Sequence, residues 1–182
     1  PGTPSIPGAI SGPVAQCPGL SGQVYSISAV ANATTYTWNV PDGWTINNGQ
    51  GTTSISVTTG LSGQNGNITV TAGNSCGTSS PNSLAVTVQP GTPATPGAIS
   101  GTAEQCPART GQVYSVSAVP NATTYTWTVP SGWSITGGNG TSSITVTTGS
   151  YGLNGNITVT AGNTCGTSSA SSLAVTVLPG TP

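Results

Sequence analysis

Four cysteines are the side chains of this 182-residue sequence best suited to covalent chemistry: Cys17, Cys76, Cys106 and Cys165. They form two pairs, and the members of each pair stand 59 residues apart. Because the sequence has no histidine and no Cys-x-x-Cys motif, a metal site has little support. We predict a disulfide within each pair, Cys17–Cys76 and Cys106–Cys165, with free buried thiols and pairing between the two halves as alternatives. A disulfide would indicate an oxidising compartment outside the cytoplasm.

Two tryptophans are candidates for ligand binding. Trp44 and Trp133 each follow a Pro-x-Gly turn, and an indole that is partly exposed there could stack on a sugar ring. The competing interpretation is that both pack inward, because an isoleucine two residues later shares their face; we favour packing. Trp38 and Trp127 lie in the middle of predicted strands beside an inward tyrosine, and we predict that both belong to the core.

Outward threonine rows are a second possible glycan surface. They comprise Thr35/Thr37, Thr69/Thr71 and Thr158/Thr160. Threonine is also a good strand former that suits a solvated face, so the sequence favours a purely structural interpretation of these rows.

Charged residues are almost absent, which excludes most kinds of enzyme. The chain has one Lys or Arg, two Asp or Glu and no His, so charged residues make up 2% of it. General acid–base catalysis and hydrolytic triads need a base that this composition does not supply. A single arginine cannot displace enough counterions to bind nucleic acid. We therefore expect a protein that is not an enzyme, binds no nucleic acid and needs neither a cofactor nor a metal.

An internal repeat sets the domain organisation. Residues 1–93 align with residues 90–182 without a gap, and 68 of the 93 aligned pairs are identical. We predict two domains, residues 1–90 and 91–182, with the last four residues opening a further repeat. The chain then represents a monomeric fragment of a longer tandem array, whose partners are the neighbouring repeats. The linker, residues 90–96, contains three prolines and should be semi-rigid.

Alternating apolar and polar residues predict about seven short strands per repeat. Asn65-Gly66 and Asn47-Asn48-Gly49 are candidate hairpin turns. No segment has helical periodicity, and no apolar run is long enough to insert into a membrane. The N-terminus does not resemble a signal peptide, so we expect any targeting signal to belong to a longer parent. The predicted fold is all-β: two tandem immunoglobulin-like antiparallel β-sandwich domains. In the first repeat the expected strands are Gly8–Ser11, Gln23–Ala29, Thr35–Val40, Trp44–Ile46, Ser54–Thr58, Asn67–Ala72 and Leu84–Val88.

The order of these elements resembles a known family. The segments that carry the resemblance are ISG, QCPG, GQVYSIS, ATTYTWNVPDGWTI, GQGTTSISV, GNITVTAGNSCGTSS and LAVTV. In this order they resemble the PKD-like, Ig-like repeats of giant Bacteroidetes cell-surface adhesins, and the gliding-motility adhesins in particular. The resemblance covers both repeats from end to end.

This resemblance implies a non-catalytic structural repeat of a very large adhesin. It implies export by the type IX secretion system and display as an extracellular filament attached to the outer membrane. The repeats would act as a stiff spacer for surface adhesion or gliding. The alternative is a carbohydrate-binding Ig-like module that contacts surface polysaccharide through exposed Trp44, Trp133 and the threonine rows.

Overall fold

The structure is a computed structural model that describes residues 2–180. It is all-β, with two compact units, Pro1–Gly91 and Thr92–Pro182, which we call module 1 and module 2. The boundary lies one residue after the one expected from the sequence. Thr181 and Pro182, which the sequence analysis assigned to the start of a further repeat, lie outside the described residues. Residues 2–180 include no helix that could span a membrane.

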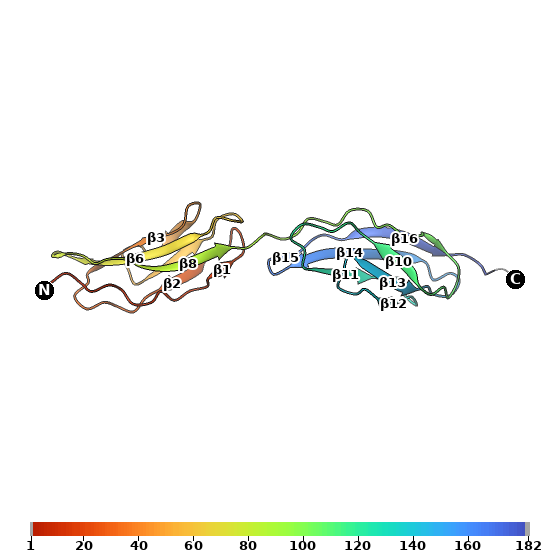
Figure 1. Cartoon of the computed structure of the whole chain (residues 1–182), viewed down its shortest axis with the longest axis horizontal. Coiled ribbons are helices and arrows are strands. Elements are labelled where there is room, and N and C mark those ends of the chain that lie inside the picture. Colours follow the sequence, from red (N-terminus) through yellow and green to blue (C-terminus); the bar gives the residue numbers. More distant parts are fainter. Residues whose placement is uncertain (1, 181–182) are drawn as a thin grey trace. The chain divides into compact units, whose positions relative to one another are not determined.

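Module 1 is a sandwich of two sheets (Figure 1). One sheet has the order β1-β8-β6-β3, with the short β7 paired to β6, and the other has the order β2-β5-β4. All pairs are antiparallel except β1 with β8, which run parallel. The strands are β1 Ala15–Gln16, β2 Gln23–Ser26, β3 Thr35–Asn39, β4 Thr45–Asn48, β5 Ser54–Thr58, β6 Gly66–Asn74, β7 Gly77–Thr78 and β8 Asn82–Val88.

Module 2 repeats this topology strand for strand. Its sheets have the orders β9-β16-β14-β11, with β15 paired to β14, and β10-β13-β12. The strands are β9 Glu104–Gln105, β10 Gln112–Ser115, β11 Thr124–Thr128, β12 Ser134–Gly137, β13 Ser143–Thr147, β14 Gly155–Asn163, β15 Gly166–Thr167 and β16 Ser171–Val177. The predicted tandem of Ig-like sandwiches is confirmed.

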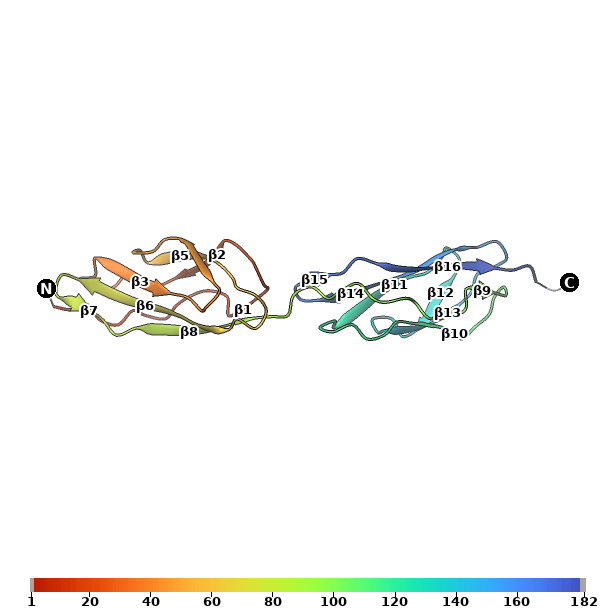
Figure 2. The same ribbon diagram turned by 90° about the horizontal axis from the view of Figure 1, so that it is seen from above.

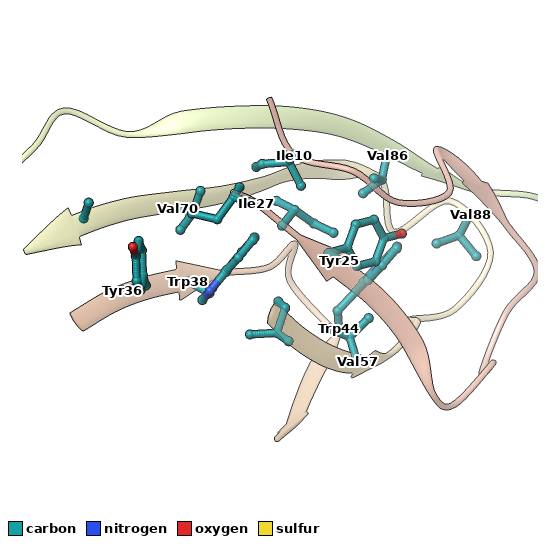
Figure 3. Close-up of a cluster of buried hydrophobic side chains, with 13 residues drawn as sticks. Ile10, Tyr25, Ile27, Tyr36, Trp38, Trp44, Val57, Val70, Val86 and Val88 are labelled. Carbon is teal, nitrogen blue, oxygen red and sulfur yellow. The ribbon is translucent and has the colours of Figure 1, made fainter. Parts of the chain in front are cut away.

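The period-two pattern buries one face of each main strand. In β3, Tyr36 and Trp38 are buried while the alternate residues, Thr35, Thr37 and Asn39, are exposed, which fits a sheet with one face on the core. One predicted strand is too long: the sequence predicts Gln23–Ala29, but β2 ends at Ser26, and Ala29 is exposed because the chain has already left the sheet. The β-branched residues of β5 and β6 complete the core between the sheets (Figure 3).

Of the two predicted hairpin turns, one is confirmed and one is wrong. Asn47-Asn48-Gly49 stands at the connection between β4 and β5, which pair in antiparallel fashion. Asn65-Gly66 instead stands where the chain crosses from β5 in one sheet to β6 in the other. There, Asn65 Oδ1 accepts a hydrogen bond from the Val88 amide at 2.7 Å. The asparagine therefore serves as a side-chain acceptor for the last strand of the module.

Candidate functional site

Trp44 and Trp133 belong to the core, so the glycan platform considered from the sequence is wrong. Each side chain is only 7% exposed. The indole N–H groups donate to main-chain carbonyls, Trp44 to Gln64 at 2.9 Å and Trp133 to Leu153 at 3.0 Å. The Trp44 ring lies 6.4 Å from the Tyr25 ring at a tilt of 54°, inside the cluster shown in Figure 3. The turn before Trp44 directs its ring inward, and no indole face remains for a sugar.

Trp38 and Trp127 lie in the core, as the sequence predicts. They are 1% and 5% exposed, and their indole N–H groups donate to Thr52 and Thr141 carbonyls at 2.8 Å. All four tryptophans are therefore core residues whose indole N–H groups are hydrogen-bonded to main-chain carbonyls.

The threonine rows lie on the outer face of the sheet that contains β3 and β6. Thr37 stands opposite Thr71, and Thr126 stands opposite Thr160. Some of these side chains bond to each other, since the Thr128 and Thr158 hydroxyls lie 2.6 Å apart. On this face the outward side chains of β3 and β6 are threonines and asparagines without an aromatic ring among them, which is the composition expected of a solvated sheet surface.

The described residues offer no other site for chemistry. Residues 2–180 enclose no pocket, and they bring together no group of three or more metal-ligating side chains. What remains is the pair of cysteines that each module carries, together with the hydrogen bonds that hold them.

The two cysteines of a module lie at opposite ends of its sandwich. Cys17 follows β1, which pairs with the last two residues of β8, at the end where the chain leaves module 1. Cys76 lies just beyond β6, where the Thr3 hydroxyl donates to its carbonyl at 3.4 Å. Figure 2 shows the same arrangement, with β7 beside the N-terminus and β1 at the other end of the module.

The predicted pairing within a module is therefore wrong. The nine residues of β6 separate its two cysteines, a length of about 30 Å at roughly 3.4 Å per residue. A disulfide needs Cα atoms within about 7 Å of each other. Cys17 and Cys165 are nevertheless each disulfide-bonded, and Cys106 is an exposed free thiol. The sequence could not reveal this, because spacing along the chain does not show which end of the sandwich each cysteine reaches.

A buried threonine fixes the position of Cys17. The Thr59 hydroxyl donates to the Cys17 carbonyl and accepts from the Leu20 amide, both at 2.8 Å, and Thr59 is 3% exposed. In module 2, Thr148 makes the same two bonds, to the Cys106 carbonyl and from the Arg109 amide. A buried hydroxyl that donates one hydrogen bond and accepts another holds both partners in one geometry. Each threonine therefore fixes the loop that carries the cysteine.

A buried tyrosine positions the same end of the module. The Tyr25 hydroxyl donates to the Pro13 carbonyl at 2.7 Å and accepts from Gln16 Nε2 at 3.3 Å. Burial raises the pKa of Tyr25, with the Gln16 hydrogen bond acting in the opposite direction. A Cβ added to Gly12 would collide with Cδ1 of the Tyr25 ring, so only glycine lets the chain cross the ring here. The signal in the sequence that could have drawn attention to this end of the module is the Gln-Cys-Pro segment, which both repeats share.

An asparagine organises the opposite end. Asn74 Oδ1 accepts from the Cys76 amide at 2.8 Å, and its amide nitrogen donates to the carbonyls of Gly2 and Asn32 at 2.9 Å. Asn32 has a positive φ of 63°, a conformation that asparagine tolerates better than most residues. In module 2 the corresponding Asn163 accepts from the Cys165 amide at 2.8 Å. The cysteine at this end is thus held by the entering chain itself.

Comparison with protein families identifies both modules. Residues 3–86 and residues 92–175 each match the family of PKD-like domains. The chain belongs to the PKD-like domain family. No enzyme family is found. Comparison with curated protein sequences gives no match.

Solved structures show that these PKD-like modules share the Ig-like fold. The I-band fragment I67-I69 from titin matches with a TM-score of 0.52 and 17% identity, over 96% of this chain and 63% of that one. The extracellular domains 3-5 of Drosophila OTK match with a TM-score of 0.53 and 16% identity, over 97% and 60%. The chain thus spans about three fifths of each of these structures, and at such identities the likeness concerns the fold alone.

Proposed function

We propose that this chain is a structural spacer repeat of a large extracellular surface protein. The observation that carries the proposal is that each module's chain enters at one end of the sandwich and leaves at the other. In module 1 the entering residue Thr3 contacts Cys76 beyond β6, and the leaving residue Gln89 donates to the Gln16 carbonyl at 2.7 Å. Tension applied through the chain ends therefore runs along the full length of the module.

The terminal strands are well placed to resist that tension. β1 and β8 are parallel neighbours, joined by bonds from Thr87 to the Val14 carbonyl and from Gln89 to the Gln16 carbonyl. Pulling on the ends draws β1 toward the entry end and β8 toward the exit end. These bonds lie across the direction of pull, so they are sheared together rather than opened one after another. The Asn82 side chain adds bonds to the carbonyls of Pro7 and Gly8.

The extracellular location is supported by the oxidised cysteines. Disulfides persist in oxidising compartments and are rare in the cytosol. A surface of hydroxyls and amides with 2% charged residues gives little salt-dependent attraction between repeats, which suits a filament outside the cell.

The finer role follows from the sequence resemblance. We propose that the parent protein is a cell-surface adhesin that serves adhesion or gliding, as in the Bacteroidetes gliding-motility adhesin SprB. Export by the type IX system, attachment to the outer membrane and contact with surface polysaccharide elsewhere in the parent belong to the same proposal. Within the array, the partners of each module are its neighbouring repeats.

Glycan titration tests the spacer role. Calorimetric titration of the two-module chain with agar oligosaccharides and bacterial surface polysaccharides should give no saturable heat, because all four indoles are buried. A Trp44→Phe variant serves as the control for any residual signal. Saturable binding that survives in this variant but is lost when Thr37 and Thr71 are both changed to Ala would assign a lectin role to the threonine face. That result would overturn the spacer proposal.

A further inference from the structure

The first residues of module 1 form an extended segment that belongs to neither sheet. Residues 2–10, which we call the strap, contain no helix or strand, and none of them has a positive φ. Three of them are nevertheless buried, Pro4, Pro7 and Ile10, while the residues between them are exposed. A strand would bury every second residue, whereas burial of every third residue is the period of a polyproline II helix, which has three residues per turn. The burial pattern therefore indicates a polyproline II helix with one face on the module.

Module 2 begins with the same pattern. Pro93, Pro96 and Ile99 are buried, and the two residues between each neighbouring pair are exposed. The inward residues are identical in the two modules, whereas the outward residues Ser5 and Ile6 of module 1 are replaced by alanine and threonine in module 2. The inward row is thus a property of the repeat, and the outward residues are free to vary.

Side chains of the sandwich hold the strap by its main-chain carbonyls. Asn82 Nδ2 donates to the carbonyls of Pro7 and Gly8 at 3.1 and 2.7 Å, and Asn74 Nδ2 donates to the Gly2 carbonyl at 2.9 Å. A polyproline II helix has no internal hydrogen bonds, so its carbonyls are available to such donors. Buried prolines on one face, combined with donors to the main chain, are typical of sites that recognise polyproline II peptides.

The strap joins the sheets only at its end. Ile10 belongs to the core cluster of module 1 (Figure 3), and the next residue, Ser11, exchanges two main-chain hydrogen bonds with Ser26 at 2.8 and 3.0 Å. Before that point, about 25 Å of chain, at roughly 3.1 Å per residue, is held by the buried prolines and by side-chain hydrogen bonds. Because no main-chain hydrogen bond joins the strap to another main-chain group of the described residues, it can leave the module while both sheets stay intact.

We propose that the surface under the strap is a binding site for a polyproline II peptide of the pattern Pro-x-x-Pro-x-x-Ile, and that the strap of a second copy of this chain occupies it when the module's own strap is displaced. The strap itself defines the ligand, because it is the segment seated on this surface in both modules. Proline fixes φ before binding, so the peptide loses little conformational entropy when it binds. In the folded module the attached strap fills the site, since its effective concentration is high. Exchange of straps would join two chains without any charged residue.

A peptide-binding measurement tests the site. In the two-module chain, Pro4→Asp together with Pro7→Asp should displace the strap of module 1, because a carboxylate is costly to bury without a partner, and should leave module 2 unchanged. The probe is a fluorescein-labelled synthetic peptide with the sequence of residues 2–11, and its fluorescence anisotropy reports binding. We expect saturable binding to this variant. Binding to the wild-type chain should be at least about tenfold weaker, because the attached strap competes with the peptide.

Matched peptides and a second variant complete the test. A peptide with Pro7→Asp should not bind, whereas a peptide with Ser5→Asp carries the same charge at an outward position and should bind like the unmodified peptide. Circular dichroism verifies that the protein variant is folded. If it is not, Asn82→Ala takes its place, because it removes the two hydrogen bonds to the strap, and it should bind the peptide more tightly than the wild type does. Absence of binding to a folded variant, or equal binding of the two Asp peptides, would overturn the proposal while leaving the spacer role untouched.

Discussion

Modules 1 and 2 differ at about one position in four, yet every strand of one has its counterpart in the other. The differences avoid the interior: among the buried residues only Ile27 changes, to Val116. Gln64 becomes Leu153, but the main-chain carbonyl at this position still accepts a hydrogen bond from an indole N–H, that of Trp44 in module 1 and of Trp133 in module 2. The comparison teaches that buried side chains and main-chain bonds specify the fold, while the outer side chains are free to vary.

One difference shows how an exposed edge is protected. In module 1 the Gln50 side chain both accepts from the Trp38 amide and donates to the Trp38 carbonyl, each at 2.9 Å, and so takes the place of a missing neighbour of edge strand β3. In module 2 the equivalent Asn139 is one methylene shorter, and among the described residues no such pair of bonds joins it to Trp127. Trp127 is accordingly 5% exposed where Trp38 is 1% exposed.

The largest expected effect tests whether the cores are equivalent. Trp38→Ala and Trp127→Ala should each destabilise their own module by about 3–5 kcal/mol, because a large buried side chain and its hydrogen bond are lost. Residue-resolved amide hydrogen exchange in the two-module protein measures the loss. The exposed Leu61→Ala variant is the control. Equal losses in both modules from one substitution would show that they unfold as a unit.

A smaller effect should distinguish the two edges. Gln50→Ala removes two hydrogen bonds from β3 and should cost module 1 about 1–2 kcal/mol. Asn139→Ala should change the free energy of unfolding of module 2 by less than about 0.5 kcal/mol. Denaturant titration followed by hydrogen exchange at β3 and β11 gives both values. If the two alanine variants have the same cost, the edge argument fails.

A reciprocal pair of variants tests the turn at the cysteine-bearing loop. Gly19 has φ of 66°, whereas its counterpart Ala108 holds φ of 53°, a conformation that costs a non-glycine residue about 1 kcal/mol. Gly19→Ala should therefore destabilise module 1 by about 1 kcal/mol, and Ala108→Gly should stabilise module 2 by slightly less. No heavy atom lies within 4 Å of a Cβ added to Gly19, so packing does not contribute. Shifts of the same sign would contradict this account.

The smallest effect should be the same in both modules. Burial raises the pKa of Tyr25 and Tyr114 above that of an unfolded tyrosine, 10.0. The folded modules then bind more protons than the unfolded chain above pH 10, so stability is retained below that value and falls as the pH rises through the folded pKa. Urea denaturation from pH 8 to 11.5 measures the decline. If the free energy of unfolding does not change over this pH range, ionisation of these phenols does not destabilise the fold, and the account is wrong.

The sequence predicted those elements whose pattern is local. Ser54–Thr58 matches β5 to the residue, and the inward residues of β3 and β6 follow from strict alternation. The two-residue strands β1 and β7 were missed, because two residues carry no periodicity. Trp44 was left ambiguous because its partner Tyr25 comes from a distant strand. The cysteine pairing failed for the same reason: only the parallel pairing of β1 with β8 reveals which end Cys17 reaches.

Force–extension measurement of single two-module chains tests most directly the claim that these repeats are tension-resisting spacers. In reductant we predict two discrete unfolding events and a final length of about 640 Å, at roughly 3.5 Å per residue. Smooth extension at low force in reductant, without discrete events, would contradict the spacer account.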